Sequence, residues 1–192
     1  MTESATEIPD TCRLTPSARI GTSAIEGNGL FATGAIAEGE TVIRIGGDII
    51  DDASLAELSA SGQRYSSVTV ADGIHLLIDP GHPVCNGNHS CAPNLWHGEG
   101  DVTTVQARRD IAVGEELTQD YGTHTGVEEW SMKCDCRALT CRGEVTGRDW
   151  RRRDLRETYG RRWAGPLLRR IESAESAEAA ELGESGEPEE TT

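Results

Sequence analysis

The sequence predicts a mainly β fold of short strands, with helices confined to one internal segment and to the C-terminal region. Short apolar and β-branched runs recur from residue 20 onward, and many of the 22 glycines separate them. These runs do not alternate with long helical segments, as they would in a parallel α/β fold. A chain of 192 residues with 36% apolar residues suffices for one domain with a core, and we expect part of the chain to lie outside it.

The first expected element is a flexible arm over residues 1–17, because this stretch is polar and contains Pro9 and Pro16. Strands are predicted at 29–33, 41–45, 48–50, 65–70, 74–78 and 103–108. A helix is predicted over 52–60, where Leu55 and Leu58 share a face and an aspartate at 51 or 52 caps the start.

The β pattern stops between residues 81 and 100, which are rich in Gly, Pro, Asn and His and include N-H-S-C-A-P-N at 88–94. An ordered irregular loop of this length is usually functional. Residues 148–172 are rich in arginine and carry apolar residues near helical spacing, so one or two short amphipathic helices are expected. Residues 173–192 are expected to form a disordered acidic tail, because glutamates recur there every third residue without an apolar face.

The net charge of −15 is unevenly distributed: residues 1–147 carry −13, residues 148–170 carry +6 and residues 171–192 carry −8. An acidic body repels nucleic acid and attracts cationic partners, although solvated surface charge explains the same composition equally well. The chain has no apolar run of eighteen residues and no signal-like N-terminus. We therefore expect a soluble, cytoplasmic monomer without membrane or direct nucleic-acid partners, or a nuclear protein if the source is eukaryotic.

Three cysteines, Cys134, Cys136 and Cys141, lie within the eight residues C-D-C-R-A-L-T-C. Thiolates are favoured zinc ligands, and three of them leave one tetrahedral position vacant. Cys12, Cys85 and Cys91 are the candidates for the fourth ligand. Redox pairs and unlinked buried cysteines are the alternatives.

Two further motifs are weak in isolation. The G-x-G at 27–29 lacks the third glycine and the strand-to-helix context of a dinucleotide site, so a β-turn is favoured there. G-E-E-L-T-Q-D-Y-G at 114–122 is typical of a turn, a short strand and a buried tyrosine. No G-x-S-x-G, H-E-x-x-H or Walker lysine motif is present, which disfavours hydrolase and nucleotide-triphosphate readings.

Four motifs follow one another along the chain: the G-x-G at 27–29, N-H-S-C-A-P-N at 88–94, G-E-E-L-T-Q-D-Y-G at 114–122 and the three cysteines at 134–141. Together they resemble the motifs of SET-domain protein-lysine methyltransferases that carry a post-SET zinc segment. The resemblance covers about residues 18–145 and implies a β-clip fold with pseudoknot-like threading. It divides the chain into a SET domain at 18–126, a post-SET zinc segment at 127–147 and the C-terminal regions described above. The composition, with Lys133 as the sole lysine among many arginines, suggests a bacterial member.

The resemblance also implies the site residues. S-adenosylmethionine (AdoMet) would bind Gly27, Asn28, Gly29, Leu30, Asn88 and His89. Tyr121 would be the active-site tyrosine, and Tyr65 lies where a second one is often found, although a tyrosine on a half-buried strand is an equal alternative. Trp150 would cover the cofactor or anchor a helix in the core. Structural zinc would bind Cys91, Cys134, Cys136 and Cys141, leaving Cys12 and Cys85 as free thiols.

The chain departs from the family pattern at several positions. Gln119 occupies the place two before the tyrosine where Phe or Tyr is usual, so the number of methyl groups added is left open. Residues 45–48 read I-G-G-D where Y-x-G-E is common. These losses give some weight to a non-catalytic interaction module as the alternative function. His97 and His124 match no motif and are expected in surface loops.

Overall fold

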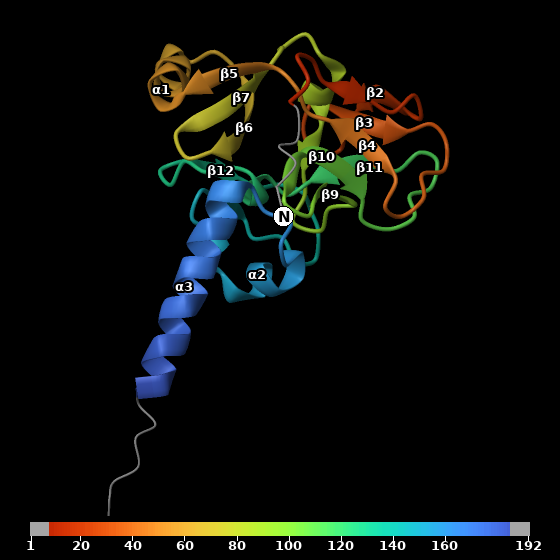
Figure 1. Cartoon of the computed structure of the whole chain (residues 1–192). Coiled ribbons are helices and arrows are strands. Elements are labelled where there is room, and N and C mark those ends of the chain that lie inside the picture. Colours follow the sequence, from red (N-terminus) through yellow and green to blue (C-terminus); the bar gives the residue numbers. More distant parts are fainter. Residues whose placement is uncertain (1–7, 185–192) are drawn as a thin grey trace, which may run out of the picture.

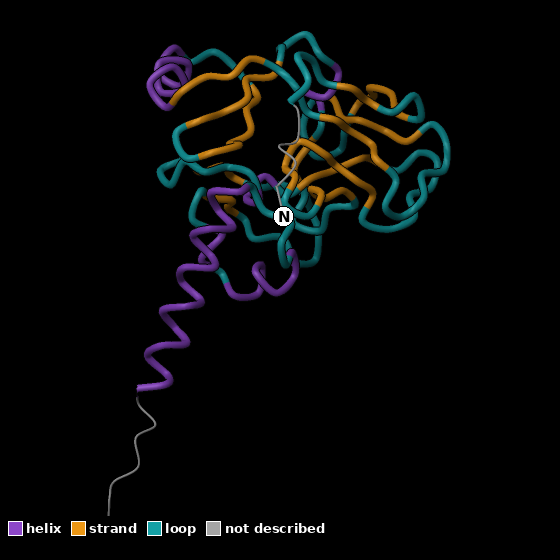
Figure 2. The backbone as a smooth tube through the Cα atoms, in the orientation of Figure 1, coloured by secondary structure: helices purple, strands orange, loops and turns teal. Residues whose placement is uncertain are grey.

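The computed structural model describes residues 8–184 and consists mainly of small β-sheets, with short helices and one long C-terminal helix (Figures 1 and 2). The strands are β1 (Arg13–Leu14), β2 (Ala18–Thr22), β3 (Asn28–Ala32), β4 (Thr41–Arg44), β5 (Asp48–Asp51), β6 (Ser66–Ala71), β7 (Ile74–Ile78), β8 (Asn88–His89), β9 (Leu95–Gly98), β10 (Asp101–Ala107), β11 (Glu116–Gln119), β12 (Ser131–Lys133) and β13 (Glu144–Thr146). The α-helices are α1 (Asp52–Ser61), α2 (Arg153–Tyr159) and α3 (Gly165–Glu184), and the 3₁₀ turns are η1 (Pro83–Asn86), η2 (Tyr121–Thr123) and η3 (Asp149–Arg151).

The strands form four sheets in the described part of the chain, with the orders β1-β4-β10-β9, β2-β3-β11-β8, β5-β7-β6 and β12-β13. The strands are short and nearly all of their pairings are antiparallel, which confirms the predicted mainly β class. The six predicted strands are all present, with ends that differ by at most two residues. Helix α1 is also confirmed, and its N-cap is Asp51, whose carboxylate accepts the amide of Ser54 at 2.9 Å.

One parallel pairing of strands brings two of the sequence motifs together. Strand β8 lies beside β11, with Asn88 opposite Thr118 and His89 opposite Gln119. The Asn94 side chain secures this junction, because it donates to the Glu116 carbonyl at 2.8 Å and accepts the Thr118 amide at 2.9 Å. The two motifs at 88–94 and 114–122, separate in sequence, therefore lie side by side.

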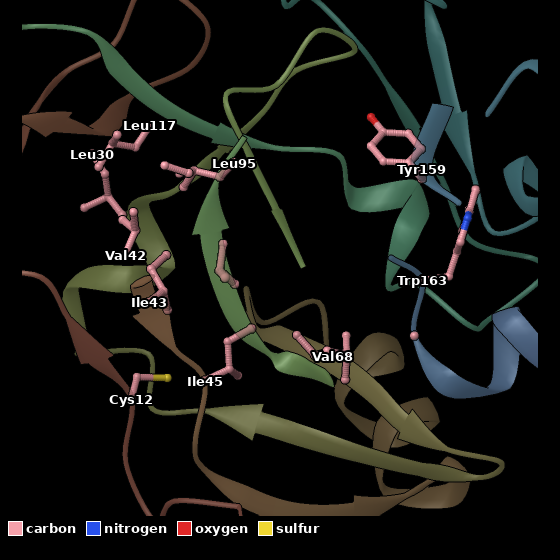
Figure 3. Packing of buried hydrophobic residues seen from close by; sticks show 14 of the residues in the cluster. Cys12, Leu30, Val42, Ile43, Ile45, Val68, Leu95, Leu117, Tyr159 and Trp163 are labelled. Carbon is pink, nitrogen blue, oxygen red and sulfur yellow. The ribbon is translucent and has the colours of Figure 1, made fainter. Parts of the chain in front are cut away.

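The core is continuous from the strands to the C-terminal segment (Figure 3). Leu30, Leu95 and Leu117 from the strands are fully buried, and so is Trp163 from the C-terminal segment. The C-terminal helices thus belong to the same hydrophobic core as the sheets.

The predicted flexible arm is wrong for its described part. Leu14 in β1 pairs with Ile43, and the Cys12 side chain is buried, with its thiol donating to the Gly46 carbonyl at 3.1 Å. A strand of two residues has no periodicity that a sequence pattern can reveal. Residues 1–7 lie outside the described part.

The predicted disordered tail is also wrong as far as residue 184, because helix α3 continues to Glu184 and projects away from the sheets (Figure 1). Buried Leu167 and Ile171 anchor its first turns, and the Ala- and Glu-rich sequence that follows has high helix propensity. Ion pairs from Arg161 to Glu172 and from Arg156 to Glu178 add support. The rest of the predicted tail, 185–192, lies outside the described residues.

All nine arginines between 148 and 170 form an ion pair with an acid of the same chain. Glu128 forms ion pairs with three of them, Arg148, Arg151 and Arg170. This internal pairing argues against the arginine-rich segment as a nucleic-acid surface. Across residues 8–184, no helix combines the length and the apolar character needed to cross a membrane.

Candidate functional site

A cavity of about 890 Å³ lies at the junction of β8, β11 and the loop that precedes β3. Its wall comes mainly from residues 25–28, 63–69, 84–89 and 132–135, with Gln119, Tyr121, His124 and Trp130. The volume is within the range of small-molecule and cofactor sites. Four stretches that are distant in sequence therefore meet around one space.

The Asn88 side chain holds the loop at the mouth of this cavity. Its amide nitrogen lies 2.9 Å from the Asn28 carbonyl, 3.1 Å from the Glu26 carbonyl and 2.8 Å from Glu116 Oε1. A Cβ at Gly29 would collide with the same Glu116 oxygen. Gly29 is thus explained by close packing of the loop against Glu116, whereas Gly27 has a positive φ of 48° that favours glycine.

His89 connects the tyrosine to the cysteines. Its Nδ1 accepts the Tyr121 amide at 3.1 Å, so the ring proton is on Nε2, which lies 3.3 Å from Cys91 Sγ. Burial lowers the pKa of His89 to about 4, against the opposing effect of Asp120. The neutral imidazole therefore donates toward the Cys91 sulfur.

Tyr121 lies in the cavity wall between the rings of His89 and His124, at centroid distances of 5.5 and 5.6 Å. Its hydroxyl donates to the Gly87 carbonyl at 2.5 Å. Burial, together with Glu26 and Cys85, raises the pKa of Tyr121 to about 12, so the phenol stays protonated at neutral pH. Gln119 also lines the cavity, and its buried amide nitrogen has no hydrogen-bond partner within residues 8–184.

Four cysteines converge beside the cavity: Cys91, Cys134, Cys136 and Cys141, with all Sγ atoms within 4.8 Å of one another. The Cys134 sulfur lies 3.7 Å from those of Cys91 and Cys141. A tetrahedral zinc site with Zn–S bonds of about 2.3 Å requires sulfurs about 3.8 Å apart. The donor set therefore fits zinc, and it contains neither Cys12 nor Cys85.

The structure brings most of the predicted site residues together, but not all of them. Gly27, Asn28, Asn88, His89, Tyr65 and Tyr121 line the cavity. Leu30 is instead fully buried in the core, and Gly29 packs against Glu116. Trp150, expected over the cofactor, is not in the cavity wall; it packs against the hydrophobic core with Arg151 over its ring at 5.1 Å. Its alternative role as a core anchor agrees with this position.

The expectation that His97 and His124 lie in surface loops is wrong. Both are buried, and His97 Nε2 lies 3.0 Å from His124 Nδ1. His124 also lines the cavity beside Tyr121. The pairing joins residues 27 positions apart, so no local sequence signal reveals it.

This histidine pair predicts acid sensitivity. Burial lowers the pKa of His97 to about 4 and that of His124 well below the ordinary value of 6.5. Below pH 6.5 the unfolded chain binds protons that the folded pair excludes, so the free energy of unfolding falls as the pH falls toward 4. The expected slope is about 1.4 kcal/mol per pH unit for each histidine.

Denaturant unfolding of the native chain and of His97→Gln between pH 7 and pH 4.5 measures this slope. The variant removes one of the two groups and should flatten the dependence. Equal slopes for the two proteins would contradict the assignment of the acid sensitivity to this pair.

Comparison with known proteins gives three findings. Residues 27–122, half of the chain, match the family model described as the SET domain. The Arabidopsis thaliana histone-lysine N-methyltransferase ASHH2 is 29% identical over 134 residues, which are 64% of this chain and 8% of that protein. A histone-lysine N-methyltransferase of Cryptococcus neoformans, described as H3 lysine-4 specific, is 31% identical over 142 residues, 65% of this chain and 9% of that protein. This chain thus spans less than a tenth of the length of either relative.

Among solved structures, the methyltransferase domain of human histone-lysine N-methyltransferase SETMAR superposes with a TM-score of 0.55. The identity is 18%, and the match covers 69% of this chain and 58% of that one. At this identity the likeness concerns the fold, which agrees with the mainly β architecture described above.

Proposed function

The chain belongs to the SET-domain family, and from this premise we propose that it is an AdoMet-dependent protein-lysine N-methyltransferase that acts on a basic protein. One observation carries the proposal. The loop at 26–28, with Asn88 and His89, lines the same cavity as the protonated hydroxyl of Tyr121. A cofactor held by the loop and an amine beside the tyrosine would therefore meet in one cavity.

AdoMet, when bound, supplies a methyl group on a sulfonium. The chain's own residues then have two tasks, to align the amine for in-line displacement and to exclude water. The Tyr121 proton points to the Gly87 carbonyl, so the phenol oxygen is free to accept a hydrogen bond from the amine. His124 is uncharged beside it and adds no positive charge that would repel a cationic substrate.

The lysine amine must lose its proton before transfer. A free lysine has a pKa of about 10.4, and desolvation in a narrow cavity lowers that value. We assign no residue of the cavity as a dedicated base, because the pKa values of its histidines, His89 and His124, are lowered and both are weak proton acceptors. The proton would leave to solvent as the side chain enters.

Zinc on the four cysteines would be structural, because four thiolates leave no open position for a reacting group. Cys134 and its neighbours Lys133 and Asp135 belong to the cavity wall. Cys91 lies three residues after Asn88. Holding the four sulfurs together would therefore close residues 132–135 over the cofactor site.

The charge distribution supports a basic protein as the substrate. Residues 1–147 carry −13, and the arginines of the C-terminal region are engaged within the chain. An acidic body attracts a basic protein segment, and association should weaken as salt increases.

The test is transfer of labelled methyl groups from AdoMet to a mixture of basic proteins that includes free core histones. Replacing Tyr121 with Phe should lower kcat about 100-fold, the cost of misaligning a reacting group, with little change in the Kd for AdoMet. Tyr65→Phe is the comparison, because the Tyr65 hydroxyl is already bonded to Ser59 Oγ at 2.5 Å.

Equal activity of the native chain and Tyr121→Phe would overturn the role of the tyrosine. Calorimetry measures whether the chain binds AdoMet, and this distinguishes an enzyme from a non-catalytic interaction module. If the zinc-loaded, folded chain fails to bind AdoMet, the non-catalytic interaction module is the better description.

A further inference from the structure

The Asp120 carboxylate, directly before Tyr121, collects four hydrogen bonds although its side chain is only 1% exposed. Arg142 donates to both of its oxygens, at 2.6 and 2.7 Å. The Tyr159 hydroxyl donates to Oδ2 at 2.8 Å, and the Gly122 amide donates to Oδ1 at 3.0 Å. A buried carboxylate with this many donors is firmly fixed in position.

The donors come from three parts of the chain. Gly122 belongs to the same turn as Tyr121. Arg142 directly follows Cys141 of the cysteine cluster, and the backbone amide of Arg142 donates to Cys91 Sγ at 3.4 Å. Tyr159 is the last residue of α2, beyond both the SET-domain match and the cysteine cluster.

The C-terminal segment, residues 148–172, also contacts the backbone that follows Tyr121. The Ala164 amide donates to the Thr123 carbonyl at 2.8 Å, and Arg170 donates to the Gly126 carbonyl at 3.3 Å. Together with Tyr159, these contacts hold the chain on both sides of the tyrosine. Tyr121 itself begins a 3₁₀ turn of three residues, a structure with little stability of its own.

We propose that three contacts from the C-terminal segment position Tyr121, those of the Tyr159 hydroxyl, the Ala164 amide and the Arg170 side chain. Tyr159 acts as a positioning residue through the Asp120 carboxylate. The inference rests on the proposed methyltransferase function and extends the catalytic unit beyond the residues that match the family. Small displacements of a reacting group are costly in rate, so a turn that is weak alone requires such external support.

Tyr159→Phe isolates the hydroxyl. The ring of Tyr159 packs edge-on against Trp163, with centroids 5.6 Å apart, and phenylalanine keeps this contact. We expect kcat to fall about tenfold, near the lower value of a hydrogen bond to a charged group. The KM for AdoMet should stay within about twofold, because the loop at 26–28 is untouched.

Trp163→Phe is the matched control in the same segment. Its indole nitrogen has no hydrogen-bond partner in the described part of the chain, so the change removes packing alone. We expect a lower Tm, with kcat of the folded, zinc-loaded fraction within about twofold of native. Equal kcat losses in the two variants would reduce the role of the segment to stability and overturn the proposal.

Amide hydrogen exchange gives a readout that needs no turnover. In Tyr159→Phe the amides of Tyr121 and Gly122 should exchange faster than in Trp163→Phe, although the control is the less stable protein. Unchanged local exchange in Tyr159→Phe would refute the positioning role. If the native chain methylates no substrate, the proposed function fails, yet this exchange comparison still decides whether the segment holds Tyr121.

Discussion

Removal of the metal from the cysteine cluster is expected to abolish both AdoMet binding and methyl transfer. Residues 134–141 contain no helix or strand, and the short β12–β13 pair flanks them. Among the described residues, the side-chain hydrogen bonds that join residues 134–141 to the rest of the chain are weak contacts to sulfur, such as the 3.4 Å contact from the Cys91 amide to Cys136. The buried ion pair of Arg142 holds only the end of this loop. Structural zinc in small domains contributes about 10–16 kcal/mol of binding free energy, which becomes folding free energy.

Chelation followed by metal analysis, calorimetry with AdoMet and amide exchange tests this expectation. Cys136→Ser should have the same effect through loss of one ligand. Cys12→Ala is the matched control: Cys12 is buried outside the cluster, so the zinc content should stay at about one ion per chain, as expected for a four-thiolate site. A verified metal-free chain that keeps full turnover would contradict the structural role.

The parts of the fold and site that could be predicted are those with local signals. Strands such as β4 and β7 have alternating or continuous apolar runs, and helix α1 has an aspartate cap. The cysteine spacing is informative because metal ligands of this kind cluster in sequence. Any one motif could occur by chance, but the order of the motifs along the chain was specific, since N-H-S-C-A-P-N followed by G-E-E-L-T-Q-D-Y-G is more informative than either motif alone.

The parts that could not be predicted depend on contacts between distant residues. Trp150 and Tyr159 carry similar local signals, yet Trp150 only packs against the core, while the buried Tyr159 also reaches Asp120, 39 positions away. His97 and His124 are polar residues in irregular sequence, and the hydrogen bond that satisfies one nitrogen of each buried ring joins them across 27 positions. The same limit applies to Arg142, which has no sequence feature that separates it from the surface arginines.

Because Arg142 is buried and the surface arginines are not, Arg142→Met has the largest expected loss of stability among the substitutions outside the cysteine cluster. Arg142 is 4% exposed and lies between two carboxylates, at 2.6 Å from Asp120 Oδ1 and 3.4 Å from Asp149 Oδ2. Arg142→Met would leave Asp120 as a buried charge without its cation. Breaking a buried pair from one side costs about 3–5 kcal/mol of unfolding free energy.

Denaturant unfolding of the zinc-loaded protein at pH 7 measures this cost. Arg151→Met is the matched control, because its ion pair with Glu128 is half exposed at 54% on the arginine side, and such pairs contribute about 1 kcal/mol or less. The double variant Asp120→Asn with Arg142→Met should recover part of the loss, since it no longer buries the Asp120 charge unpaired. If Arg142→Met loses no more stability than Arg151→Met, the buried pair does not join the zinc segment to the turn of Tyr121. If Arg142→Met lowers the free energy of unfolding strongly and the double variant partly recovers it, the unpaired Asp120 charge causes the loss. The need to pair this charge would then explain why the zinc segment, the tyrosine turn and the C-terminal helices must fold together.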